Sequence, residues 1–182
     1  MKTTTVKQKT FFAFLLLIGW IGILVGPGCA SLGRGSTQKV HLRVYLEASV
    51  NDPTQTMVAP VYRKQPVLIR IQKEPILDER DLVHAAVVKG MGGYSIELVF
   101  DFHGKLVLQQ VSNAYRGRRL VLQAVFPEAR WLGIVRMNRP IMDGVLTFTP
   151  DATQQEAQRI VDGLNRVARK LGNYVPLVPT KS

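Results

Sequence analysis

An amphipathic segment at residues 153–172 constrains the fold of this chain more than any other feature. Thr153 and Glu156 have the spacing of a capping box, in which each side chain satisfies the other's free backbone N–H at a helix start. Gly172 stands where a helix can end in the left-handed conformation. Between them, apolar residues recur at helical spacing: Ala157, Ile160, Val161, Leu164, Val167, Ala168 and Leu171. We therefore predict a long C-terminal helix whose apolar face covers a sheet.

Period-two alternation upstream predicts the strands of that sheet. Residues 40–49 alternate apolar and polar side chains from Val40 to Ser49, which is typical of a half-buried strand. Residues 118–126 are rich in Leu and Val and indicate a central strand. The same reasoning predicts four further strands, at residues 67–71, 94–101, 131–137 and 145–149.

Two shorter helices are predicted between the strands. Asp78 has the chemistry of an N-cap for a helix over Leu82 to Ala86, with Gly90 as its stop. Residues 102–116 form the other, ended by Gly117. The order of elements predicts an α+β fold with a single mixed, largely antiparallel sheet and helices packed on one face. We expect this domain at residues 39–172, followed by a flexible tail at 173–182.

The N-terminal segment reads as an export signal. Lys2, Lys7 and Lys9 precede residues 11–25, which carry no charge. A basic region followed by a short apolar region describes a secretory signal, and the apolar region falls short of the roughly 20 residues of a spanning helix. We predict a signal peptide at residues 1–28.

Cys29, the single cysteine, stands where this signal ends. The segment resembles the lipobox of bacterial lipoproteins; Gly28 fits the pattern, whereas Gly26 and Pro27 depart from it. The resemblance implies lipid attachment at Cys29 after cleavage, a membrane anchor, and, from Ala30, sorting to the outer membrane with the domain facing the periplasm. Residues 29–38 would then be a tether. The alternative is ordinary cleavage nearby, for instance after Ala30, with Cys29 discarded.

A resemblance to a known family covers residues 75–164. It rests on short pieces that follow one another in the order found in that family: Asp81-Leu82, Ala85-Ala86, residues 96–104, residues 117–122, Pro140-Ile141, residues 143–145 and residues 153–157. Together they resemble the head subdomain of the first periplasmic domain of SecD and SecDF, membrane proteins that assist bacterial protein export. The resemblance implies that fold and a general envelope role. The chain departs from the family at residues 123–125 and 138–139 and carries no bundle of transmembrane helices, so we do not expect a complete export motor.

Local motifs for catalysis and metal binding are not found in this sequence. The sequence contains no nucleophile elbow, phosphate loop, zinc-protease helix or Cys-x-x-Cys pair, so we predict no catalytic residue, no metal site and no cofactor. Asp101 and His103 form the one acid–base pair at close range, and Asp101 is expected to cap the following helix. His41 and His84 are expected to be solvated or packing residues.

The formal net charge of +11 includes arginines that concentrate in the second half of the chain. Such an excess could contact anionic lipid headgroups or acidic envelope polymers, although an evenly solvated basic face explains it as well. Nucleic acid is disfavoured, because export separates the protein from it and no aromatic residues interleave the basic ones. The candidate contacts for an anionic partner are Arg116, Arg118, Arg119, Arg130, Arg136 and Arg139.

These observations predict a non-catalytic, lipid-anchored envelope domain that binds a polypeptide or an envelope component, with export machinery as a candidate partner. The alternative is an envelope enzyme whose site is assembled from scattered polar residues. The sequence alone does not indicate an oligomeric state.

Overall fold

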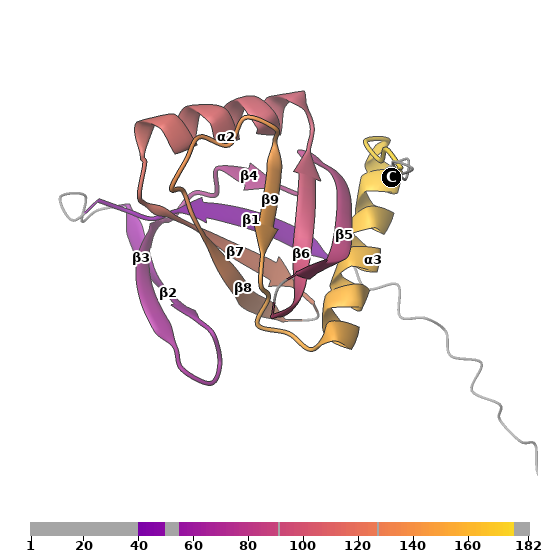
Figure 1. The fold of residues 1–182 in the computed structure, drawn as a ribbon, viewed down its shortest axis with the longest axis horizontal. Helices are drawn as coiled ribbons and strands as arrows, with labels where there is room; N and C mark the ends of the chain where they lie inside the picture. Colours follow the sequence, from indigo (N-terminus) through magenta and orange to yellow (C-terminus); the bar gives the residue numbers. More distant parts are fainter. Residues whose placement is uncertain (1–39, 50–54, 91, 127, 177–182) are drawn as a thin grey trace, which may run out of the picture. The chain divides into compact units, whose positions relative to one another are not determined.

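The computed structural model describes residues 40–49, 55–90, 92–126 and 128–176. The signal peptide, Cys29 and the tether predicted at residues 1–38 lie outside the described residues. The helices and strands follow in the order β1 (His41–Leu46), β2 (Thr56–Val61), β3 (Val67–Gln72), β4 (Leu77–Asp78), β5 (Leu82–Gly90), β6 (Gly93–Phe100), α2 (Phe102–Ala114), β7 (Arg119–Val125), β8 (Ala129–Arg136), β9 (Val145–Phe148) and α3 (Gln154–Leu171) (Figure 1).

A four-stranded antiparallel sheet in the order β4-β1-β7-β8 lies at the centre. The predicted central strand at residues 118–126 is confirmed, because β7 has a neighbour on each side. One face of this sheet carries Leu42, Val44, Leu120 and Leu122, all fully buried. This face contributes to the main core of the described residues.

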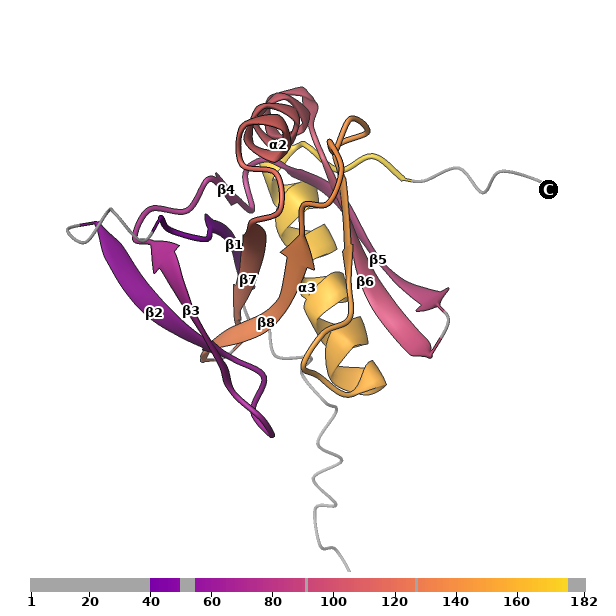
Figure 2. The same ribbon diagram turned by 60° about the vertical axis from the view of Figure 1, so that its left-hand side comes forward.

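A second antiparallel sheet, in the order β5-β6-β9, contributes to the same core together with α3. Figure 2 shows α3 running alongside β5 and β6. The apolar stripe predicted for this helix is buried at Ala157, Ile160, Val161, Leu164 and Ala168, whereas Leu171 is exposed. The capping box at Thr153 and Glu156 and the left-handed Gly172 are both present, so the predicted helix is confirmed.

Asn165 fixes α3 to β5 within this apolar face. Its side-chain Oδ1 accepts from the Ala85 N–H, and its Nδ2 donates to the Ala85 carbonyl, each at 2.8 Å. β5 is an edge strand, so the amide of Asn165 satisfies backbone groups that have no neighbouring strand. This polar contact within the predicted apolar stripe was not anticipated from the sequence.

The β2–β3 hairpin lies on the other side of the central sheet from α3 (Figure 2). Ile69 and Ile71 of the hairpin pack with Tyr45 and Val121 of the sheet in a second, smaller core. Tyr45 is therefore buried, although the alternation in the sequence places it on the polar face of β1. β2 was not predicted; its Pro60 lies on a strand that pairs with β3 alone, and proline is tolerated on such edge strands.

The helix predicted from Asp78 to Gly90 is wrong, because residues 82–90 form β5, paired along their length with β6. The Asp78 side chain does make local turn contacts, accepting from the Arg80 N–H at 2.8 Å. The chain then enters a strand with a register shift between Leu82 and His84. That bulge buries Leu82 and Ala85, three residues apart, and so imitates the burial spacing of a helix.

The predicted α+β class is confirmed, but the described strands form three antiparallel sheets instead of a single mixed one. Residues 173–175, which we predicted as the start of a flexible tail, contact the body of the domain. The Asn173 side chain donates to the Arg80 carbonyl at 2.6 Å, and the Val175 N–H donates to the Val83 carbonyl at 3.4 Å. Neither α2 nor α3, the helices of the described part of the chain, combines the length and the apolar character that a membrane span requires.

Candidate functional site

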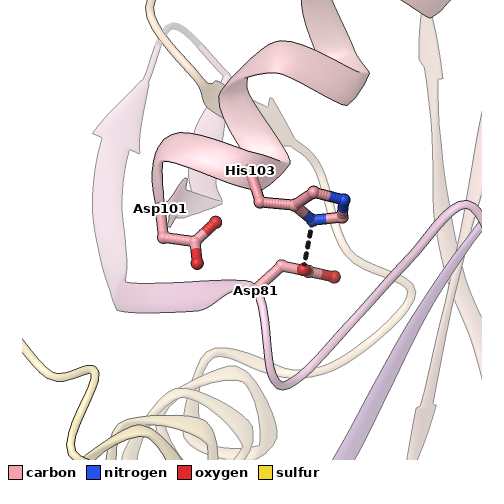
Figure 3. Close-up of side chains that lie close together, drawn as sticks. All are labelled: Asp81, Asp101 and His103. Carbon is pink, nitrogen blue, oxygen red and sulfur yellow. Dashed lines mark hydrogen bonds and ion pairs between the residues drawn. The ribbon is translucent and has the colours of Figure 1, made fainter.

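The junction between β6 and α2 gathers Asp81, Asp101 and His103 (Figure 3). Asp101 caps α2 as predicted, because its Oδ1 accepts from the Gly104 N–H at 2.8 Å. Gly104 allows the helix to start close to the strand; a Cβ at this position would lie 2.7 Å from the Phe100 Cβ.

His103 pairs with Asp81 and not with its sequence neighbour Asp101. The His103 Nδ1 lies 2.8 Å from the Asp81 Oδ1, as the dashed line in Figure 3 marks. The other carboxylate oxygen of Asp81 accepts from the Asp78 N–H at 3.0 Å, and the Asp81 carbonyl accepts from the Asp101 N–H at 2.8 Å. Asp81 therefore ties together the turn before β5 and the start of α2.

Ligand atoms of these three residues lie within 4.8 Å of one another, and carboxylate and imidazole groups are ligands that divalent cations accept. Each of the three side chains already has a hydrogen-bond partner within the junction. These hydrogen bonds are enough to explain why the three side chains lie close together. A cavity of about 370 Å³ adjoins the pair and is lined by Pro75, Ile76, Leu77, Asp78, Arg80, Asp81 and His103. None of these lining residues carries a hydroxyl or thiol nucleophile.

The two other histidines lie in different surroundings. His41 is exposed on β1, and its Nδ1 lies 2.7 Å from the Glu79 Oε1. His84 lies on β5, where its ring packs against that of Tyr174, with 5.6 Å between centroids. Burial lowers the pKa of His84 below its ordinary value. Both positions agree with the predicted solvated and packing roles.

The structure brings together three of the six predicted arginines. Arg118, Arg119 and Arg136 line one cavity of about 320 Å³, together with Gly117 and residues 47–49. Arg119 and Glu47 form an ion pair there, and the Arg119 guanidinium lowers the pKa of the Glu47 carboxyl below its ordinary value.

The other three arginines are dispersed. Arg130 lies at the opposite end of β8 from Arg136, where it pairs with Glu156 at 3.3 Å and donates to the Asp151 carbonyl at 2.7 Å. Arg116 and Arg139 are exposed and do not line the cavity.

An apolar surface patch on α2 was not predicted from the sequence. Phe102 and Leu106, one helical turn apart, are 76% and 45% exposed, and Met142 in the segment before β9 is 53% exposed. The Gln109 Nε2 lies 3.3 Å from the Met142 sulfur, which places that segment along the same helix. In the sequence, this patch is indicated only by the apolar pair Phe102 and Leu106 at i, i+4 spacing. The sequence does not show which face of α2 meets the core, so it does not show that the pair is exposed.

The comparison with solved structures adds a fold relationship. A structure of SecDF, described as a membrane component that enhances protein export, matches 90% of this chain and 71% of its own chain, at 15% identity and a TM-score of 0.50. SecDF in a super-membrane-facing form matches 70% of this chain and 19% of its own, at 16% identity and a TM-score of 0.52. The chain shares its fold with part of SecDF.

This likeness confirms the resemblance to SecD and SecDF predicted from the sequence, at the level of the fold. The chain corresponds to less than a fifth of the length of the second SecDF structure. No protein-family model matches the chain, and no curated protein matches it by sequence.

Proposed function

We propose that this chain is a non-catalytic, periplasm-facing domain of the bacterial envelope that takes part in protein export by binding apolar stretches of polypeptide. The observation that carries the proposal is the shared fold with SecDF, a membrane component that enhances protein export. A lipid at Cys29 would hold the domain at a membrane, with the outer membrane as its expected location.

The α2 patch, defined as Phe102, Leu106 and Met142, is the surface we propose for the polypeptide. Large apolar side chains gathered at one exposed place are typical of interaction sites. An aromatic ring and a flexible methionine adapt to apolar partners of varied shape, which suits a surface that meets many sequences. These residues lie on a helix and on an adjoining segment, outside the two cores of the domain.

Binding of a permanently unfolded, apolar model polypeptide to the purified full-length chain tests this surface. Fluorescence anisotropy should show saturable binding, and Leu106→Ser should weaken it about tenfold, because the side chain loses an apolar contact of about 1.4 kcal/mol. The matched control is Leu68→Ser on β3, where the side chain is 69% exposed and lies outside the patch. Equal weakening by Leu68→Ser, or no saturable binding, would contradict the proposed surface.

The link to export has a separate cellular test. Deleting the gene should slow the conversion of precursor to mature form for exported proteins in a pulse–chase measurement, and the unmutated chain should restore the rate. A Leu106→Ser chain, present at equal level, should restore it less than a Leu68→Ser chain. An unchanged export rate in the deletion strain would contradict the export role even if the polypeptide binds.

A further inference from the structure

Three arginines meet at one end of the central sheet with a single carboxylate among them. Arg118 and Arg119 lead into β7, Arg136 ends β8, and Glu47 directly follows β1. Their side chains line the cavity of about 320 Å³, together with Ala48, Ser49 and Gly117. We call this the arginine pocket.

Strand register concentrates the positive charge. Arg119 and Arg136 are Cα partners across the β7–β8 ladder, so two cations lie directly opposite each other. Like charges at such positions destabilise a sheet. Arg118, next in sequence, adds a third cation to the same cavity. This arrangement needs negative charge nearby.

Glu47 supplies part of that charge and is committed to Arg119. Its Oε2 accepts from the Arg119 backbone N–H at 2.9 Å and from its Nε at 3.0 Å, and its Oε1 pairs with the Arg119 Nη2. The four groups therefore leave an excess of two positive charges, on Arg118 and Arg136.

Arg118 and Arg136 keep hydrogen-bond donors available to a ligand. The Arg118 guanidinium lies over the Tyr115 ring, 4.8 Å from its centroid, and stacking of this kind leaves the N–H groups at its edge unused. Arg136 donates its Nε to the Gly117 carbonyl at 3.3 Å. Among the described residues, no ion pair involves either side chain.

We propose that the arginine pocket binds a phosphate group through Arg118 and Arg136. Two guanidinium groups present planar forks of N–H donors, which match the oxygens of a phosphate and the charge it carries. A cavity of about 320 Å³ also has room for a substituent on the phosphate, as in a lipid headgroup. This site is separate from the α2 patch and does not depend on polypeptide binding.

Isothermal titration of the full-length chain, in a nonionic detergent and low-salt buffer, with inorganic phosphate tests the site. We expect saturable binding at one site, weakened about tenfold by Arg118→Gln and by Arg136→Gln, because each removes a charge-assisted pair. Arg159→Gln is the matched control: it removes the same charge from an exposed position on α3 that does not line the pocket, and it should leave affinity unchanged.

The Glu47→Gln variant is expected to bind phosphate more tightly, a result that loss of folding could not produce. Removing the resident carboxylate frees Arg119 for the ligand, so phosphate affinity should rise several-fold in this variant. The absence of saturable binding by the unmutated chain, or equal weakening by Arg118→Gln and Arg159→Gln, would overturn the proposal.

The source of the phosphate is decided by a second titration with glycerophosphoglycerol, the deacylated headgroup of phosphatidylglycerol. Tighter binding of this diester than of inorganic phosphate identifies a lipid headgroup as the source, and the reverse order identifies a free phosphate. Both outcomes support a phosphate site. Binding of either ligand should be lost in the Arg118→Gln, Arg136→Gln double variant.

Discussion

His84 shows how packing can hold a side chain in place while one of its ring nitrogens has no hydrogen-bond partner in the described part of the chain. The Nδ1 atom is buried and unpaired among the described residues. The ring packs on Tyr174, and the Arg169 guanidinium lies over that same Tyr174 ring, 4.1 Å from its centroid. Burial lowers the pKa of His84; the charge of Arg169 adds to the decrease, whereas the charge of Glu97 and a hydrogen bond with the Val175 backbone oppose it.

The lowered pKa predicts a loss of stability in mild acid. The unfolded chain takes up a proton at His84 near pH 6.5, whereas the folded chain does so only at lower pH. The unfolded state therefore binds more protons in this interval, and the free energy of unfolding falls as pH decreases below 6.5. Denaturant unfolding between about pH 7.5 and about pH 5.5 measures the effect.

In His84→Gln this part of the pH dependence should disappear, since glutamine does not titrate. The Glu47 carboxyl, whose pKa is lowered by Arg119, contributes in a different interval, below its ordinary pKa of 4.5. A variant that keeps the full slope between about pH 6.5 and about pH 5.5 would show that other groups produce it.

At the scale of elements, the contact between α3 and the start of β1 depends on a glycine inside a helix. Gly163 is buried on α3, and a Cβ at this position would overlap the Val40 Cγ2 methyl and lie 3.1 Å from its Cβ. Val40 is fully buried and β-branched, so its side chain has little freedom to move away. Close packing here outweighs the higher helix propensity of alanine.

Gly163→Ala should therefore destabilise the domain by about 2 kcal/mol, opposite to the effect of the same change at an exposed helical position. Val40→Ala alone should also destabilise it, because it leaves a cavity. The double variant should cost less than the sum of the two single changes, since the smaller side chain makes room for the new methyl. Denaturant unfolding of all four chains gives the coupling, and simple additivity would contradict this contact.

The elements that the sequence predicted well are those with a complete local pattern. α3 carries its cap, its stripe and its stop within residues 153–172, and β1, β6 and β7 have long apolar patterns of strand type. β5 was mistaken for a helix because its apolar residues, Leu82, Val83, Ala85 and Ala86, fit helical spacing as well as they fit a strand with a bulge between Leu82 and His84. Only the pairing of this segment with β6, which is a tertiary contact, shows that it is a strand and not a helix.

Among the candidate sites too, the contacts between sequence neighbours were predicted and the contacts between distant residues were not. The cap at Asp101 follows from neighbouring residues, and it was predicted. The His103–Asp81 pair and the arginine pocket join residues far apart in the chain, and they depend on which strands lie side by side. Sequence composition indicated that arginines were in excess, but only the β7–β8 register shows that Arg119 and Arg136 face each other.

At the scale of the whole molecule, the described domain presents separate surfaces that differ in chemistry. The α2 patch is apolar, whereas the arginine pocket is positively charged and lies at an end of the central sheet. The β2–β3 hairpin covers the outer face of that sheet and adds a second small core. A domain of this kind could bind a polypeptide and an anionic group at once, provided that it is held where both are present.

Attachment of lipid at Cys29 would provide that location, and it can be tested directly. A single acyl chain gives marginal membrane binding, whereas additional chains give stable anchoring, because each buried methylene contributes about 0.8 kcal/mol. We expect the mature N-terminal peptide of the unmutated protein to begin at Cys29 and to carry the added mass of acyl groups.

Membrane association of Cys29→Ser is a poor test, since an uncleaved apolar segment at residues 11–25 could still hold the precursor at the membrane. Mass spectrometry of the N-terminal peptide avoids this ambiguity. A peptide that begins at Ser31, or a Cys29 without added mass, would exclude the lipid anchor and leave export by an ordinary signal peptide in place.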